Sequence, residues 1–166
     1  MIAQTQYTQM AVDTLCEGLN DPIPQIRAKS AESLGKIGSD RAVGSLVSHL
    51  YDSDITVRLN IIQALGEIAS HNAIPDLVNY LNDPDSTIRS ATAETLGKIG
   101  SEQAISYLCQ SLNDTDSSVR ATAVKALGQI GSQEAIPALI QAFHDTDDTV
   151  RLNAADAIGK IGSRYS

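Results

Sequence analysis

The side chains best suited to nucleophilic, redox or metal chemistry in this sequence are two cysteines and three histidines. Cys16 and Cys109 lie far apart, and none of His49, His71 and His144 has a cysteine or a second histidine three or four residues away. Zinc sites are usually built from such close pairs. No nucleophile elbow, phosphate-binding loop or dinucleotide fingerprint is present either. We therefore predict no metal site, no cofactor and no catalytic residues, and interpret the histidines as solvated residues at helix ends.

A regular pairing of arginine with aspartate is the strongest chemical pattern. One arginine and one aspartate recur at intervals of 31 residues: Arg27, Arg58, Arg89, Arg120 and Arg151, with Asp21, Asp52, Asp83, Asp114 and Asp145. An arginine can bind a carboxylate through two parallel hydrogen bonds. An anion-binding stripe is one interpretation, but a ligand site seldom needs five copies. We therefore favour a structural ladder in which each arginine binds a carboxylate of a neighbouring turn.

The same period governs glycine and isoleucine positions, which indicates a repeat architecture. These positions are Gly35, Gly66, Gly97, Gly128 and Gly159, and Ile37, Ile68, Ile99, Ile130 and Ile161. The chain, residues 1–166, is thus predicted to be a single domain of five repeats, approximately residues 8–38, 39–69, 70–100, 101–131 and 132–162.

Each repeat contains two helical patterns, which we call helix A and helix B. In the third repeat, apolar residues at helical spacing run from Ala73 to Leu81 (helix A) and from Ile88 to Ile99 (helix B). Gly100 suits the left-handed residue that ends a helix, and Ser101 suits the cap of the next one. Aspartates are placed to cap four of the helices B, at Asp54, Asp85, Asp116 and Asp147, and Pro24 stands at the first position of the other.

Two residue types have an expected place in the packing of these helices. A glycine inside a helix costs about 1 kcal/mol relative to alanine, so the repeated glycine of helix B predicts close approach of a neighbouring helix. Cys16 and Cys109 share one position of the repeat with Val47, Val78 and Ile140. This predicts a buried apolar position, with the two thiols about 30 Å apart at about 10 Å per helix layer, rather than a redox pair.

Composition excludes several classes of protein. Apolar residues make up 42% of the chain and aromatic residues 4%, which favours a core of Ala, Val, Ile and Leu. The net charge of −8 disfavours nucleic acid as a partner. The first basic residue is Arg27, and no uncharged stretch approaches the length of a membrane span. We therefore expect a soluble cytoplasmic protein with no membrane insertion.

The repeat unit resembles the HEAT-like repeat of the phycobilisome lyase family. The resemblance rests on D-x-D-x-x-V-R-x-x-A and A-L-G-x-I-G, seen together in residues 114–131 as DTDSSVRATAVKALGQIG, and extends from about Thr8 to Gly162. The family includes paired subunits that attach bilins to phycobiliproteins, proteins of phycobilisome degradation and unrelated interaction scaffolds. The resemblance therefore implies the fold, an all-α, right-handed α-solenoid of five two-helix HEAT-like repeats, more specifically than the activity.

The outward-facing positions of the helices B form the candidate binding surface. They lie one, two, five and nine residues after the repeated arginine, and we call them the B-helix surface. The predicted partner-binding residues are Lys29, Glu32, Lys36, Leu59, Asn60, Gln63, Glu67, Ser90, Glu94, Lys98, Thr122, Lys125, Gln129, Leu152, Asn153, Asp156 and Lys160. All five lysines of the chain belong to this set, whereas ten aspartates lie at the turns between helices A and B. The alternative is that these charges only solvate an exposed helix face.

These observations predict a non-catalytic scaffold that recognises a folded protein on the concave face, where solenoids usually bind. The family resemblance points to a phycobiliprotein, or a second HEAT-like chain, as the partner. The alternative is a subunit of a heteromeric bilin lyase, enzymatic only with a second chain. The last repeat carries an apolar stripe, Val150, Ala154, Ile158 and Ile161, which no following hairpin covers. We therefore also expect this end to be covered, either by self-association through the C-terminal repeat or by a partner chain, as in the paired lyase subunits that the repeat resembles.

Overall fold

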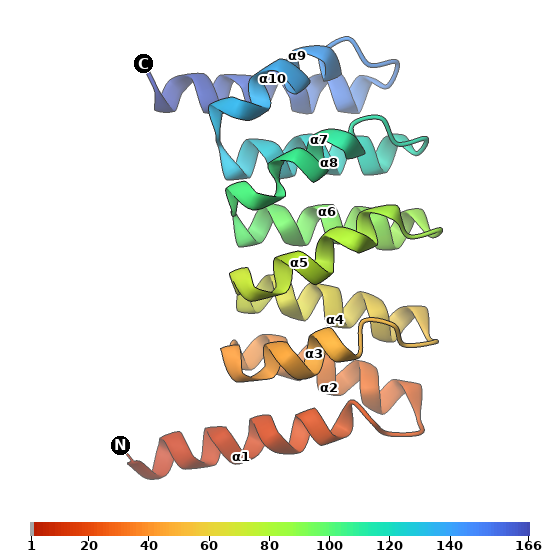
Figure 1. Ribbon diagram of the computed structural model, residues 1–166, viewed down its shortest axis with the longest axis vertical. Helices are drawn as coiled ribbons and strands as arrows, with labels where there is room; N and C mark the ends of the chain where they lie inside the picture. The colour runs from red at the N-terminus through yellow and green to blue at the C-terminus, as the bar shows by residue number, and fades with distance from the viewer. Residues whose placement is uncertain (1) are drawn as a thin grey trace. The chain divides into compact units, whose positions relative to one another are not determined.

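The computed structural model describes the backbone of residues 2–166 and the side chains of residues 5–166. Every regular element within these residues is a helix, and none is a strand. The chain divides into two compact units, residues 1–73 and residues 74–166, and each unit is a stack of helical hairpins (Figure 1). The predicted all-α repeat fold is confirmed.

The first unit contains two hairpins and the beginning of a third. Its elements are α1 (Ile2–Gly18), α2 (Pro24–Ile37), the 3-10 helix η1 (Asp40–Ala42), α3 (Val43–Ser48), α4 (Ile55–Ile68) and the 3-10 helix η2 (His71–Ala73). Helices α2 and α4 are helices B and pack side by side, whereas α1 and α3 are helices A.

The second unit repeats this arrangement. Its elements are α5 (Ile74–Leu77), the 3-10 helix η3 (Val78–Asn82), α6 (Ser86–Ile99), η4 (Glu102–Ala104), α7 (Ile105–Ser111), α8 (Ser117–Ile130), η5 (Gln133–Ala135), α9 (Ile136–Ala142) and α10 (Asp148–Arg164). The helices B of this unit, α6, α8 and α10, form one layer, and α5, α7 and α9 form the other (Figure 1). Leucine, isoleucine, valine and alanine fill the space between the layers, as the composition predicts.

Aspartate side chains cap four of the five helices B, as predicted. The carboxylates of Asp54, Asp85, Asp116 and Asp147 each accept a hydrogen bond from a backbone N–H of the first helical turn, at 2.7–2.8 Å. Such a bond satisfies an N–H that has no partner within the helix. Helix α2 has no side-chain cap and begins at Pro24 instead.

The ends of the helices B also follow the repeat, with two exceptions. Gly38, Gly100 and Gly131 adopt the left-handed conformation that ends a helix, with φ of 68° to 76°. Ala69 occupies the same position with a φ of 56°, although this conformation is unfavourable for a residue with a Cβ. Helix α10 passes through the equivalent Gly162 and continues to Arg164.

The predicted helix A of the third repeat differs from the structure. A single α-helix was expected from Ala73 to Leu81, but α5 ends at Leu77 and the chain continues as the 3-10 helix η3. The side-chain amide of Asn79 donates to the carbonyl of Pro75 at 3.3 Å. Asn60 donates to the carbonyl of Thr56 in the same way at 3.0 Å within the regular α-helix α4, so this bond does not by itself account for the 3-10 segment.

The repeated glycines lie where neighbouring helices B come closest, as predicted. A Cβ on Gly97 would lie 2.8 Å from the Cα of Ala126, and a Cβ on Gly35 would lie 2.8 Å from the Cα of Ala64. Both distances are shorter than carbon atoms tolerate. At Gly159, by contrast, a Cβ would meet no atom within 4 Å.

Candidate interaction surface

The repeated arginines and aspartates form the predicted ladder within each unit. Arg120 donates from Nε and Nη2 to the two carboxylate oxygens of Asp145, both at 2.8 Å. Arg27 binds Asp52 and Arg89 binds Asp114 in the same bidentate way, at 2.6–2.8 Å. In each pair the aspartate belongs to the repeat that follows the arginine, so one ion pair links consecutive hairpins.

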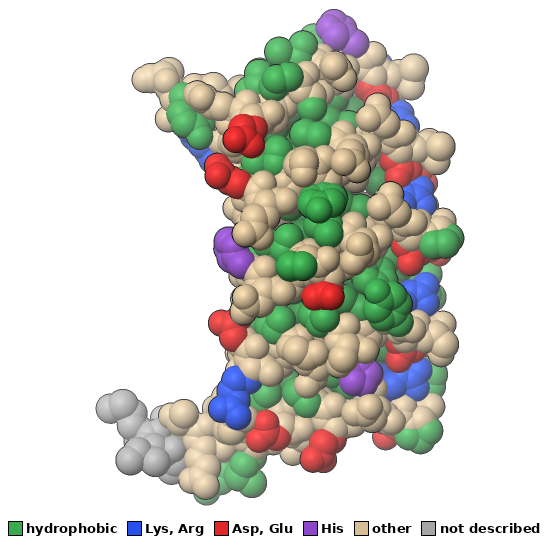
Figure 2. All heavy atoms as spheres, viewed as in Figure 1, with side chains coloured by type: hydrophobic (Ala, Val, Ile, Leu, Met, Phe, Trp, Pro, Cys, Tyr) green, Lys and Arg blue, Asp and Glu red, His purple; other side chains and the backbone are tan. Residues whose placement is uncertain are grey.

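The ladder satisfies Arg27, Arg89 and Arg120 and leaves them little capacity for a ligand. Arg58 forms no ion pair with a described side chain: its Nη1 donates to the carbonyl of Asp52 at 2.9 Å, and its buried Nε has no hydrogen-bond partner among the described residues. Each of these arginines also donates from Nη1 to a backbone carbonyl of its own turn, and Arg120 does so to Asp114 at 2.9 Å. Hydrogen bonds from Arg120 lower the pKa of Asp145 to about 2. Basic and acidic side chains accordingly stand together along the turn edge of each unit (Figure 2). The anion-binding interpretation therefore loses three of its five arginines to pairs between repeats.

The B-helix surface is exposed at two of its four positions and partly packed at the other two. Every residue nine positions after the arginine is exposed, and so is every residue five positions after it except the half-buried Glu32. The residues one or two positions after it are mostly half-buried, including Leu59, Asn60, Ser90, Thr122 and Asn153.

The partly packed positions join neighbouring helices B in the second unit. The hydroxyls of Ser90 and Thr122 lie 3.0 Å apart, and the amide of Asn153 donates to the carbonyl of Ala121 at 3.3 Å. The sequence pattern predicted that side chains at these positions contact a partner. In the structure, α6, α8 and α10 lie so close together that some of these side chains bind the neighbouring helix instead. Leu152 is the exception, since 71% of it is exposed.

Charge is distributed unevenly over this surface. In the first unit, Lys29 and Lys36 both pair with Glu32, and these hydrogen bonds lower the pKa of Glu32 to about 2. Glu67 lies on the same unit, so its two lysines are balanced by two acids.

In the second unit, Lys98 pairs with Glu94 at 2.7 Å and Lys160 pairs with Asp156 at 2.6 Å. Lys125, on the central helix α8, has no acidic residue three or four positions away. The surface of this unit therefore has one positive charge in excess, and that charge is centred on Lys125.

The cysteines are less buried than predicted. Cys16 and Cys109 are both half-buried free thiols, although Val78 at the same position of the repeat is buried. Burial raises the pKa of the Cys109 thiol, which disfavours the nucleophilic thiolate. Within residues 5–166, no group of three or more His, Cys, Asp and Glu side chains is arranged to hold a metal ion. No helix among the described residues is long and apolar enough to span a membrane.

The histidines divide into two kinds. His71 and His144 are exposed, as predicted, but His49 is half-buried and hydrogen-bonded. Its Nδ1 lies 2.7 Å from the carbonyl oxygen of Ser45 and 3.3 Å from the hydroxyl of Ser48. A carbonyl accepts only from N–H, so Nδ1 carries a proton and cannot deprotonate Ser48. The Ser48–His49 pair is therefore not a nucleophile with its base.

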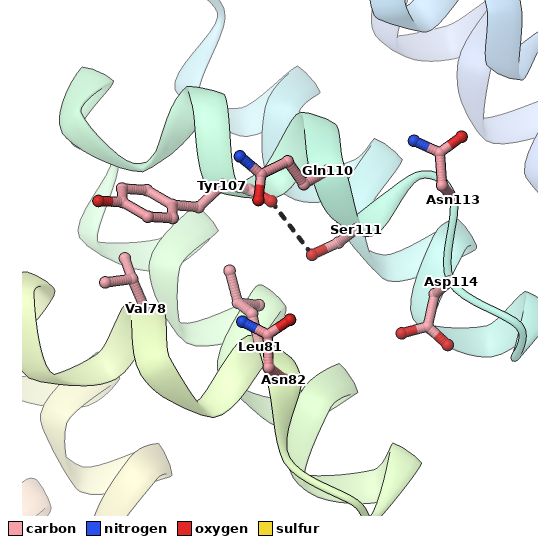
Figure 3. Close-up of a pocket in the computed structure, with 8 residues that line it drawn as sticks. All are labelled: Val78, Leu81, Asn82, Tyr107, Gln110, Ser111, Asn113 and Asp114. Carbon is pink, nitrogen blue, oxygen red and sulfur yellow. Dashed lines mark hydrogen bonds between the residues drawn. The ribbon is translucent and has the colours of Figure 1, made fainter.

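A shallow groove of about 190 Å³ lies between η3 and α7 in the second unit (Figure 3). Val78, Leu81 and Tyr107 supply its apolar part, and Asn82 and Gln110 lie at its rim. Two of its other polar side chains, Ser111 and Asp114, are already bound. The hydroxyl of Ser111 donates to the carbonyl of Tyr107 at 3.3 Å, and Asp114 belongs to the ladder. The groove thus offers exposed amides and no reactive group.

The sequence matches the family model of HEAT repeats over residues 1–56, 43–120 and 105–165, which together span almost the whole chain. The chain belongs to the HEAT repeat family. No curated protein sequence gives a significant match to it.

Solved HEAT-like structures are similar to this HEAT repeat chain. The complex of CpcE and CpcF of phycocyanin lyase from Nostoc sp. PCC7120 has a TM-score of 0.81 and 25% identity, covering 92% of this chain and 65% of that chain. An engineered protein has a TM-score of 0.69 and 27% identity, covering 92% and 79%. A designed armadillo repeat protein in complex with the peptide (KR)4 has a TM-score of 0.67 at 22% identity, covering 89% and 80%, which is a likeness of fold alone.

Proposed function

We propose that this HEAT repeat chain is a non-catalytic scaffold that binds a folded protein through the B-helix surface of its second unit. The segregation of charge carries the proposal. All five lysines lie on the helices B, whereas ten aspartates lie at the turns. A partner with an acidic patch would be attracted to the first surface and repelled from the second, which fixes its orientation.

Three features of the second unit suit such a partner. Lys125 has no acidic residue three or four positions away in α8, so its positive charge is not neutralised by a pair within the helix. Lys98 and Lys160 stand on the neighbouring helices, and each is held by a carboxylate one turn earlier in its own helix. Leu152 adds an exposed apolar contact beside them. Together they form a polar surface with one apolar anchor, a composition typical of non-obligate interfaces.

The similarity to the CpcE–CpcF complex of phycocyanin lyase makes phycocyanin the first partner to test. We expect the variant with Lys98→Glu and Lys125→Glu to fold normally, since exposed charges contribute little to stability. It should bind purified phycocyanin about tenfold more weakly in a titration and show a reduced dependence on salt.

A matched control adds the same negative charge to the opposite side of the unit. Changing the exposed residues Gln103, Gln110, Gln133 and Gln141 to Glu alters the net charge as much as the two lysine reversals do. This control should bind as the unmodified chain does. Full binding by the lysine variant would show that the B-helix surface is not the site. Failure of the unmodified chain to bind phycocyanin would instead reject this partner, and mass spectrometry of co-purifying proteins would then identify another.

A second function, as one subunit of a heteromeric bilin lyase, is favoured by the same structural similarity. The two functions differ in a direct observable. A lyase subunit should change the visible absorbance of a free linear tetrapyrrole on titration, whereas a scaffold should not.

A further inference from the structure

The two terminal hairpins carry complementary halves of the interface that joins the repeats. Within the units, every ladder arginine with a following repeat binds the aspartate 25 residues further on, as in Arg27–Asp52, Arg89–Asp114 and Arg120–Asp145. The last arginine of the series, Arg151, and the first aspartate, Asp21, lack such partners among residues 5–166.

Arg151 shows the effect of the missing partner in its side-chain position, whereas Asp21 differs from the paired aspartates only in lacking an ion pair with a described side chain. Arg151 turns to Asp148 in its own helix, and its side chain is 40% exposed, compared with 14% for Arg120. The carboxylate of Asp21 accepts the backbone N–H of Ile23 at 2.8 Å and forms no ion pair with a described side chain. The last hairpin therefore carries an arginine, Arg151, without a ladder carboxylate. The first hairpin carries a carboxylate, Asp21, without a ladder arginine.

The outer face of α10 carries small residues at the positions that are buried against the next helix B in α6 and α8. Ala93 of α6 and Val124 of α8 are fully buried under the next helix B, but their equivalent in α10, Ala155, is exposed. Gly128 of α8 receives the Cα and Cβ of Ala157, whereas Gly159 of α10 faces no atom within 4 Å.

Phe143 and Leu152, together with Ala155, line an open apolar hollow of about 480 Å³ at this end. The predicted stripe must be corrected here. Val150, Ala154 and Ile161 are buried within the second unit, because they pack inward, and the exposed stripe is the neighbouring one.

The outer stripe of α2 is the counterpart. Ile26 is 41% exposed, although its equivalents Val119 and Val150 in the second unit are fully buried. Ser33 occupies the same position of the repeat as Ala126 and Ala157. Ala126 packs against Gly97 of the preceding helix B, and Ala157 packs against Gly128. Ser33 is therefore a small residue on α2 at the position that packs against a glycine in other repeats.

We infer that this chain self-associates head to tail, with the α9–α10 face of one copy receiving the α1–α2 face of a second copy. Gly159 of the first copy then accepts Ser33 of the second, as Gly128 accepts Ala157. Arg151 of the first copy leaves Asp148 and binds Asp21 of the second, which adds one rung to the ladder. Such an interface joins different faces, so it propagates from copy to copy into closed rings or open-ended oligomers. Leu152 belongs to both this face and the B-helix surface, but the inference does not depend on the proposed function.

Sedimentation velocity of the full chain, from micromolar to millimolar concentration, tests the inference. The unmodified chain should form dimers and longer oligomers as its concentration rises. Gly159→Trp places a large side chain on the α10 stripe, at a position where a Cβ meets no described atom within 4 Å, and should yield a monomer. Ser33→Trp blocks the α2 stripe and should also yield a monomer. An equal mixture of the two variants should form dimers and nothing larger, because one competent interface remains in each pair.

A charge exchange tests the rung itself. Asp21→Arg alone and Arg151→Asp alone should each weaken association about tenfold or more, the usual effect of breaking a charge-assisted hydrogen-bonded pair. A chain with both changes restores an opposite-charge pair across the interface and should recover association. A chain that stays monomeric at every concentration, or that associates unchanged as Gly159→Trp, would overturn the inference. Absence of rescue in the double exchange, with both single variants weakened and folded, would overturn the rung.

Discussion

Arg120 shows how one side chain fixes the spacing of two hairpins. Its guanidinium donates to both carboxylate oxygens of Asp145 in the following repeat and to the carbonyl of Asp114 in its own turn. The side chains of Arg120 and Asp145 are only 14% and 12% exposed, so solvent screens the pair weakly. The planar guanidinium suits this role better than an ammonium, because its donors diverge at fixed angles.

We expect Arg120→Ala to lower the free energy of unfolding by about 2–3 kcal/mol, because it leaves the Asp145 carboxylate without its charged partner. Arg120→Lys should recover only part of this loss, since lysine keeps the charge without the bidentate geometry. Urea unfolding of both single variants and of the double variant with Asp145→Ala measures the coupling. Arg41→Ala, at an exposed arginine outside the ladder, is the control and should change little. A coupling below about 0.5 kcal/mol would show that the rung is not structural.

Helix-to-helix distance in this fold is set by glycine and alanine rather than by large side chains. Gly97 faces Ala126, and Gly128 faces Ala157, so α6, α8 and α10 approach each other with almost no side chain between them at these points. The cost of a glycine within a helix is offset there by the dispersion contacts of closely packed backbones. Gly159 bears the same cost in α10, where a Cβ would meet no atom of the described residues within 4 Å.

The same substitution at two equivalent positions should therefore have opposite effects. Gly97→Ala places a Cβ 2.8 Å from Ala126 and should destabilise the protein by about 1–3 kcal/mol. Gly159→Ala meets no atom and should stabilise α10 by up to about 1 kcal/mol through its higher helix propensity. Thermal and urea unfolding of the two variants at low protein concentration, where the chain is monomeric, gives the comparison. Equal destabilisation by both changes would mean that the close contact at Gly97 does not matter.

Periodicity predicted these elements well because each relevant signal is local. The capping carboxylates of Asp54 and Asp116 bind N–H groups two residues away, so their spacing already encodes the contact. The ladder was predictable for a related reason, since a period of 31 places Arg89 and Asp114 in adjacent turns.

The candidate surface was predicted less completely because its exposure depends on contacts between repeats. Helical spacing shows that Ser90 and Thr122 face away from the helices A, but not that their hydroxyls meet. Nor does spacing reveal that α5 ends at Leu77 and that the chain continues as the 3-10 helix η3. The meeting of the two hydroxyls depends on how closely neighbouring helices pack, and that distance has no period.

Over the molecule as a whole, acidic residues at the turns link folding to pH. Several of these aspartates have a lowered pKa: Asp52, Asp114, Asp116, Asp145 and Asp147. Hydrogen bonds from the ladder arginines are the main cause for the paired residues, and hydrogen bonds from the capped helix turn or a neighbouring serine are the main cause for the others. Each group therefore binds its proton more weakly in the folded protein than in the unfolded chain.

A carboxylate whose pKa falls on folding stabilises the native state fully above its unfolded pKa, near 4, and loses that contribution as the pH falls through its folded pKa. For Asp145 this window extends from about pH 4 down to about pH 2. We therefore expect the urea midpoint to fall steeply from about pH 5 to pH 2, with the ladder aspartates responsible for much of the slope. The variant with Asp52→Asn, Asp114→Asn and Asp145→Asn should be less stable at neutral pH but should vary less over this range. An unchanged acid dependence in that variant would assign the effect to other carboxylates, because the three ladder positions would then contribute nothing to proton linkage.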